Sequence, residues 1–101
     1  MTVANDNIAP TVSIRAPVSG ATVRGTITVA ATATDNVSVA GVQFKLDGVN
    51  LGAEVTTAPY VVSWNTTTVL KGAHTLTAVA RDAADNASTS SAVTVTVKNR
   101  R

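Results

Sequence analysis

Two groups of acidic and amide side chains carry most of this chain's capacity for chemistry. The first group is Asp35 and Asn36, and the second is Asp82, Asp85 and Asn86. Each follows a run in which polar and apolar residues alternate, the pattern of a half-buried β-strand. Successive side chains of a strand point to opposite faces, so Asp35 and Asp82 continue the inward-facing rows of their runs. The sequence therefore predicts two strands that each end in a turn with an inward carboxylate.

Two interpretations of these turns stay open. Ca²⁺ takes six to eight oxygen ligands in a flexible site, and the predicted metal site then comprises Asp35, Asn36, Asp82 and Asp85. Further oxygen donors are Asn86 and the N-terminal Asn5, Asp6 and Asn7. Alternatively, each Asp or Asn accepts backbone N–H groups of its own turn and the chain needs no cofactor. An inward carboxylate with neither a metal nor a donor would be strongly destabilising, so one interpretation must hold.

Seven alternating runs supply the strands that position these turns. Val and Thr, which suit a pleated and half-buried surface, dominate the runs, and no helical period occurs. The predicted strands are Val12–Ile14, Thr26–Thr34, Val42–Leu46, Leu51–Thr56, Tyr60–Trp64, Ala73–Arg81 and Ala92–Lys98. Seven short strands of this kind are typical of an all-β protein with an immunoglobulin-like, seven-stranded antiparallel β-sandwich.

The chain's 101 residues fit one domain. We expect a linker or leader at residues 1–9, the sandwich at 10–98 and a short tail at 99–101. The basic residues are scattered singly until Lys98, and only three aromatic residues are present, so nucleic-acid binding is not expected. No apolar run is long enough to span a membrane, and the N-terminus lacks the regions of a signal peptide. We expect one module of a longer exported protein.

The remaining candidate residues favour structure over catalysis. Trp64 and Tyr60 share the phase of Val62, and with so few aromatics we expect core packing rather than a sugar-stacking platform. His74 is the only histidine and has no nucleophile beside it, so it forms neither a triad nor a zinc site. A partly exposed, hydrogen-bonded histidine near the rim of the sandwich is expected instead. No nucleophile–base pair or phosphate-binding loop occurs, so the chain is not expected to be an enzyme.

Four segments together resemble the bacterial immunoglobulin-like domains. The segments are Pro-Thr-Val-Ser-Ile14 with Ala-Pro17, Val42 to Gly48, Ala58 to Asn65, and His74 to Asn86. Such domains occur singly or in tandem in exported glycoside hydrolases, proteases and surface adhesins. The resemblance spans residues 10–97 and implies a non-catalytic accessory module, often a spacer, that is extracellular or on the bacterial cell surface. The family commonly has Gly where this chain has Asp85.

The immunoglobulin strand order would place both Asp-Asn turns at one pole of the sandwich, where the first strand begins, while the last strand ends at the other pole. Copies joined end to end would then form a stalk, with neighbouring domains of the same polypeptide as partners. We favour this spacer role. The alternative is a carbohydrate- or cell-surface-binding module, including a calcium-stiffened one. Lys98 and Pro17 lie beside the edge strands and discourage edge pairing, so we expect a monomer.

Overall fold

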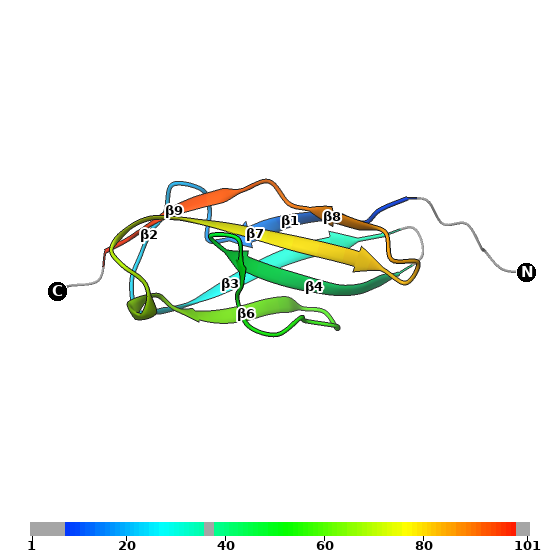
Figure 1. The fold of residues 1–101 in the computed structure, drawn as a ribbon, viewed down its shortest axis with the longest axis horizontal. Helices are drawn as coiled ribbons and strands as arrows, with labels where there is room; N and C mark the ends of the chain where they lie inside the picture. Colours follow the sequence, from blue (N-terminus) through cyan, green and yellow to red (C-terminus); the bar gives the residue numbers. More distant parts are fainter. Residues whose placement is uncertain (1–7, 36–37, 99–101) are drawn as a thin grey trace, which may run out of the picture.

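Two β-sheets pack face to face in the computed structural model, which describes residues 8–35 and 38–98 (Figure 1). The smaller sheet has the order β1–β3–β6, with β1 at Thr11–Ala16, β3 at Thr26–Thr34 and β6 at Tyr60–Asn65. The larger sheet has the order β2–β9–β7–β4–β5. Its strands are β2 at Thr22–Val23, β9 at Val93–Val97, β7 at Gly72–Asp82, β4 at Val39–Leu46 and β5 at Val49–Asn50. A short strand β8, Ala87–Thr89, also pairs with β7, and a 3₁₀ turn η1 covers Thr66–Thr68. The predicted all-β sandwich is confirmed.

The core lies between the sheets and follows the predicted phases. In β3, Val29 and Ala31 are buried, while the alternate threonines are exposed. The larger sheet contributes inward rows from three strands: Val42 and Phe44 from β4, Leu76, Ala78 and Ala80 from β7, and Val93, Val95 and Val97 from β9. Alternation therefore assigned the inward side of each long strand correctly, because one face of each strand must leave water.

The strand count differs from the prediction, because the described residues contain nine strand segments rather than seven. The first predicted strand corresponds to β1, which pairs with β3, and the chain then crosses to the other sheet, where the unpredicted strand β2 runs parallel to β9. The last predicted strand corresponds to β9, and the unpredicted strand β8 precedes it, with Ser90 between the two. The Ser90 hydroxyl accepts the Ala78 N–H at 2.9 Å, while Ser90 N donates to Ala78 O at 2.8 Å.

The predicted strand Leu51–Thr56 is wrong. Pairing with β4 stops at β5, after which Val55 forms a single isolated bridge with Val42. The cause is Gly52, which has a φ of +76° and so takes the chain out of the extended region. Its carbonyl accepts Gln43 Nε2 at 3.0 Å, which holds this segment as a loop.

The two ends of the sandwich differ, and the strand registers define which segments meet at each end. Thr11 pairs with Thr34, and Val39 pairs with Asp82, so β1 begins at the end where β7 stops. Val97 pairs with Gly72, so β9 finishes at the opposite end, where β7 begins (Figure 1). We call these the acidic end, which carries Asp35, Asp82 and Asp85, and the basic end, which carries Arg24, Lys71 and Lys98.

Some predictions fall on residues outside the described part of the chain. These are the linker residues 1–7, the tail 99–101 and the candidate ligand Asn36. Among the described residues, no helix has the length and apolar character to cross a membrane.

Candidate functional site

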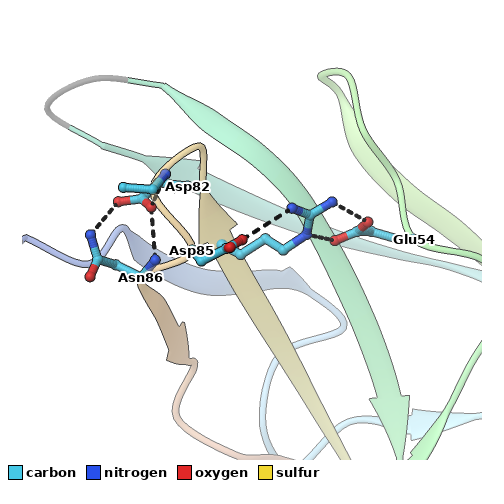
Figure 2. Close-up of polar contacts among 6 residues, drawn as sticks. Glu54, Asp82, Asp85 and Asn86 are labelled. Carbon is cyan, nitrogen blue, oxygen red and sulfur yellow. Dashed lines mark hydrogen bonds and ion pairs between the residues drawn. The ribbon is translucent and has the colours of Figure 1, made fainter. Parts of the chain in front are cut away.

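The Asp82 carboxylate is fully buried and accepts hydrogen bonds from its own turn (Figure 2). Oδ1 accepts the backbone N–H groups of Ala84 and Asn86, both at 2.9 Å, and Oδ2 accepts Asn86 Nδ2 at 3.1 Å. The main chain closes the same turn, since Asp82 N donates to Asn86 O at 2.9 Å. A buried carboxylate with three such donors is compensated for its lost hydration. These contacts support the turn-capping interpretation of Asp82.

Asp85 serves the same turn through its backbone rather than its side chain. Its φ of +66° is in the left-handed region, which favours Gly and is tolerated by Asp and Asn. This conformation also suits Gly, the residue that the family resemblance implies at this position. The Asp85 side chain is 88% exposed and lies 3.9 Å from Arg81 Nη1. Figure 2 shows the Asp85 carboxylate directed away from the Asp82 carboxylate.

Asp35 lies at the same end as Asp82 but bonds within its own turn. Its Oδ2 accepts the Ser38 N–H at 3.3 Å, and Ser38 directly precedes the residue that pairs with Asp82. The predicted meeting of both turns at one end of the sandwich is therefore present. Within residues 8–35 and 38–98, however, no group of three or more His, Cys, Asp or Glu side chains is placed to hold a metal ion.

A second polar contact at this end joins Arg81 of β7 to Glu54 of the loop after β5. The guanidinium binds both carboxylate oxygens, with Nε–Oε2 at 2.7 Å and Nη2–Oε1 at 3.0 Å (Figure 2). The hydrogen bonds from Arg81 hold the pKa of Glu54 below its ordinary value. Glu54 crosses β4 at Gly41, where an added Cβ would lie 2.5 Å from the carboxylate. In the sequence, the feature that could have revealed this contact is Gly41, because a glycine within a strand indicates the close approach of another group.

His74, near the basic end, forms polar contacts through both of its ring nitrogens. Its Nδ1 lies 2.5 Å from Asp47 Oδ2 and its Nε2 lies 2.7 Å from Leu70 O, so both ring nitrogens face acceptors. A neutral imidazole donates from one nitrogen alone, and this arrangement therefore requires the imidazolium form. Asp47 also accepts the Thr75 N–H at 2.8 Å. The predicted hydrogen-bonded histidine is confirmed, and its partner Asp47 was missed.

The charges of this pair shift both ionisation equilibria. The hydrogen bond to Asp47, followed by that to Leu70 O, raises the pKa of His74 above 6.5, although partial burial opposes the shift. Partial burial raises the pKa of Asp47, but the hydrogen bonds from His74 and Thr75, with the charge of His74, outweigh it. The pKa of Asp47 is consequently lowered from 3.8. The pair ties the β4–β5 turn to the start of β7, and the contact with Leu70 O ties the same ring to the preceding loop.

Trp64 lies in the core and Tyr60 packs against it, as predicted, and Tyr60 also lines a groove. Trp64 is 1% exposed, which confirms core packing, and its ring meets His74 edge-on at a centroid distance of 6.4 Å. Tyr60 is half-buried and lines a shallow groove of about 250 Å³ where β6 begins. Other residues that line the groove include Arg15, Thr32, Thr34 and Pro59.

Two packed sheets, with a first strand shared between them and the last strand beside β7, define an immunoglobulin-like β-sandwich module. The chain belongs to the bacterial Ig domain family, which matches residues 10–78.

Solved structures support the same class. The fibronectin(III)-like modules of Clostridium thermocellum CbhA are 30% identical, cover 90% of this chain and 100% of theirs, and superpose with a TM-score of 0.72. The endo-beta-1,4-mannanase from Thermotoga petrophila is 17% identical and covers 94% of this chain, with a TM-score of 0.76. This chain spans 21% of that enzyme, and the likeness shows the fold alone. No curated protein sequence matches the chain.

Proposed function

We propose that this chain is a non-catalytic structural spacer module of a larger extracellular bacterial protein. The observation that carries the proposal is the placement of the two outer strands, since β1 begins at the acidic end and β9 finishes at the basic end. The 11 residues of β7 link the two ends. At a rise of about 3.3 Å per residue, this strand would hold the domains joined to the two ends about 33 Å apart.

The use of the charged side chains supports a structural role. Asp82 closes its own turn, Glu54 and Arg81 neutralise each other, and His74 is engaged at both ring nitrogens. Groups held in this way are unavailable as general acids, bases or nucleophiles without loss of a structural contact. The likeness to the fibronectin(III)-like modules of CbhA is consistent with an accessory module.

A direct test measures whether the module holds its ends at a constant separation. The chain has no cysteine, so Thr11→Cys and Lys98→Cys allow two dyes to be attached at the two ends. We expect energy transfer to report one narrow distance of about 33 Å, set by the strand rise, that does not change with salt or added polysaccharide. A broad or polysaccharide-dependent distance distribution would contradict a rigid spacer.

The groove beside Tyr60 supports one alternative, a polysaccharide-binding module. Tyr60 and Pro59 offer apolar surface, and Arg15 with Thr32 and Thr34 offers polar partners, a combination typical of small-molecule sites. Pull-down with insoluble cellulose, mannan and xylan tests this polysaccharide-binding function, and the Tyr60→Ala variant, which lacks the aromatic ring of the groove, serves as the comparison. If the protein binds a polysaccharide and Tyr60→Ala abolishes the binding, the polysaccharide-binding function replaces the spacer proposal. If all of the protein stays in the supernatant, the result supports the spacer proposal.

Calcium at the acidic end is the remaining hypothesis. Thermal unfolding in excess calcium and in excess chelator distinguishes a bound ion from capped turns, because a ligand that binds only the folded state raises the melting temperature. Equal melting temperatures would support capping by Asp35 and Asp82. A melting temperature that calcium raises in the unsubstituted protein, but not in Asp85→Asn, would instead support the metal site.

A further inference from the structure

The basic end presents three cations and one exposed leucine. Arg24 follows β2, Lys98 follows β9 and Lys71 precedes β7, and all three are exposed. They lie at one end because Val23 pairs with Val97, which in turn pairs with Gly72. Leu70, beside Lys71, is 84% exposed. This surface has the composition of a contact site, with an apolar side chain bordered by charge.

The loop that carries Leu70 is anchored rather than loose. Leu70 O accepts His74 Nε2 at 2.7 Å, and Val69 N donates to Thr66 O at 3.3 Å. Thr66 in turn donates its backbone N–H, at 2.9 Å, and its hydroxyl, at 2.7 Å, to Gly25 O. The leucine is thus displayed on a fixed support, and little conformational entropy remains to be lost when a partner covers it.

The acidic end carries the complementary features. Asp85 is 88% exposed, Asp35 is half-buried, and Ile8, just before β1, is 60% exposed. Arg81 is a cation at this end; Glu54 binds it at both carboxylate oxygens, and the exposed Asp85 carboxylate lies 3.9 Å from it. At the other end, the charge of Asp47 is met by His74. The two ends therefore have opposite charge, and each has an exposed aliphatic side chain.

We propose that the basic end of one module docks onto the acidic end of a second copy, so that modules stack head to tail. Arg24, Lys71 and Lys98 would face Asp35 and Asp85, and Leu70 would share the interface with Ile8. Such a heterologous contact does not close on itself and suits a linear array. The inference rests on the proposed spacer function, and it names the surfaces through which successive modules would stiffen their joint.

The contact need only be weak. Modules joined by a short linker meet at an effective concentration in the millimolar range, so a dissociation constant of about 1 mM suffices to dock tethered neighbours. Free copies then remain monomeric in dilute solution and associate as their concentration approaches about 1 mM at low salt, where exposed charges are least screened. This behaviour makes the isolated chain a usable test system.

The test follows ¹⁵N amide shifts while the chain is concentrated from micromolar to millimolar at low salt. We expect concentration-dependent shifts at both ends, at Leu70 and Lys71 and at Ala84 and Asp85, with the middle of β4 unchanged. Raising the salt should remove them. Unchanged spectra up to about 2 mM, beyond the effective concentration of a tethered neighbour, would overturn docking. Such a result would leave the spacer proposal intact, since that proposal depends on the end-to-end distance within one module.

Substitutions at the two ends, alone and mixed, sharpen the test. Leu70→Ser should weaken association about tenfold through lost apolar burial. Lys71→Glu and Asp85→Lys should each abolish the shifts. An equimolar mixture of these two variants should restore them, because the unchanged basic end of Asp85→Lys can then meet the unchanged acidic end of Lys71→Glu.

The matched control makes the same charge change away from both ends. Lys45 pairs with Thr77, midway along β7, so Lys45→Glu should leave association unaltered. Failure of the mixture to restore the shifts, or an equal loss in Lys45→Glu, would refute the pairing of the basic end with the acidic end.

An acidic polysaccharide is the competing occupant of the basic end. Soluble polygalacturonate would then shift Leu70 and Lys71 while Ala84 and Asp85 stay unchanged at every protein concentration. That result would assign the basic end to polysaccharide and overturn stacking. Shifts at both ends that polygalacturonate suppresses by competition would support the proposal.

Discussion

Replacing Asp47 by Asn tests whether the contact with His74 is a charged pair. The substitution suits the site, because Asp47 has a φ of +52°, which Asn also tolerates. The Oδ1 atom of the new amide can still accept the Thr75 N–H that Asp47 accepts at 2.8 Å. The change therefore affects one atom, the oxygen that faces His74 Nδ1, which becomes an N–H donor.

The size of the effect follows from the exposure of the pair. A hydrogen bond to a charged group contributes about 1.5–3 kcal/mol to the free energy of unfolding. The Asp47 side chain is 46% exposed, and solvent screening reduces the contribution of so exposed a group, to about 1 kcal/mol. For a domain of this size we expect Asp47→Asn to lower the melting temperature by about 4–8 °C in mildly acidic solution.

The effect has a defined pH dependence. The pKa of His74 is raised above 6.5, so the contribution of the pair is fully present below pH 6.5 and disappears as pH rises through the folded-state value. The pKa of Asp47 is lowered from 3.8, so the contribution is also lost as pH falls through its folded-state value. The pair thus contributes most between pH 3.8 and 6.5.

In alkaline solution the variant should lose its disadvantage. The amide N–H introduced at position 47 then donates to the unprotonated Nδ1 of His74, while Nε2–H donates to Leu70 O, so the ring remains satisfied. In the unsubstituted protein, a neutral His74 that donates to Asp47 leaves Leu70 O without its N–H donor. The two proteins should therefore have similar free energies of unfolding at about pH 9, well above the ordinary pKa of histidine.

The assay is urea unfolding of both proteins at the two pH values, with an NMR titration of the His74 ring. We expect the His74 pKa to fall in the variant. A loss of stability that is equal at both pH values, or an unchanged His74 pKa, would refute the charged pair.

Three further predictions concern the core and the acidic end. Acrylamide should barely quench the emission of Trp64, which is 1% exposed, until the protein unfolds; strong quenching of the folded chain would contradict its place in the core. Asp82→Ala leaves the N–H groups of Ala84 and Asn86 without their acceptor and should cost about 2–4 kcal/mol in urea unfolding, whereas a loss near zero would mean that another group caps the turn. Asp85→Gly should be more stable than Asp85→Ala by about 1 kcal/mol, because Ala disfavours the left-handed conformation; equal stabilities would show that the turn adopts another backbone conformation.

Alternation predicted the long strands because burial of one face constrains every second residue. The inward positions of Val29, Phe44 and Leu76 followed from that period alone, as did the inward Asp82 at the end of its row. The turn at Asp82 was also predictable, because its carboxylate accepts the N–H groups of Ala84 and Asn86, two and four residues further along the chain. Such local contacts depend on residue type and short spacing, both of which the sequence contains.

By itself, the sequence determined the fold class, the core rows and the turn that follows Asp82. Only the tertiary structure decided which distant groups meet: His74 lies 27 residues from Asp47, and Arg81 lies 27 residues from Glu54. The exchange of the first strand between sheets was likewise decided by pairing of β2 with β9. These contacts depend on strand order and register across the sandwich. The alternation pattern describes only residues close in sequence, so it does not predict which distant residues become neighbours when the sheets assemble. The opposite charges of the two ends arise in the same way, from chain segments that are distant in sequence and adjacent in the fold.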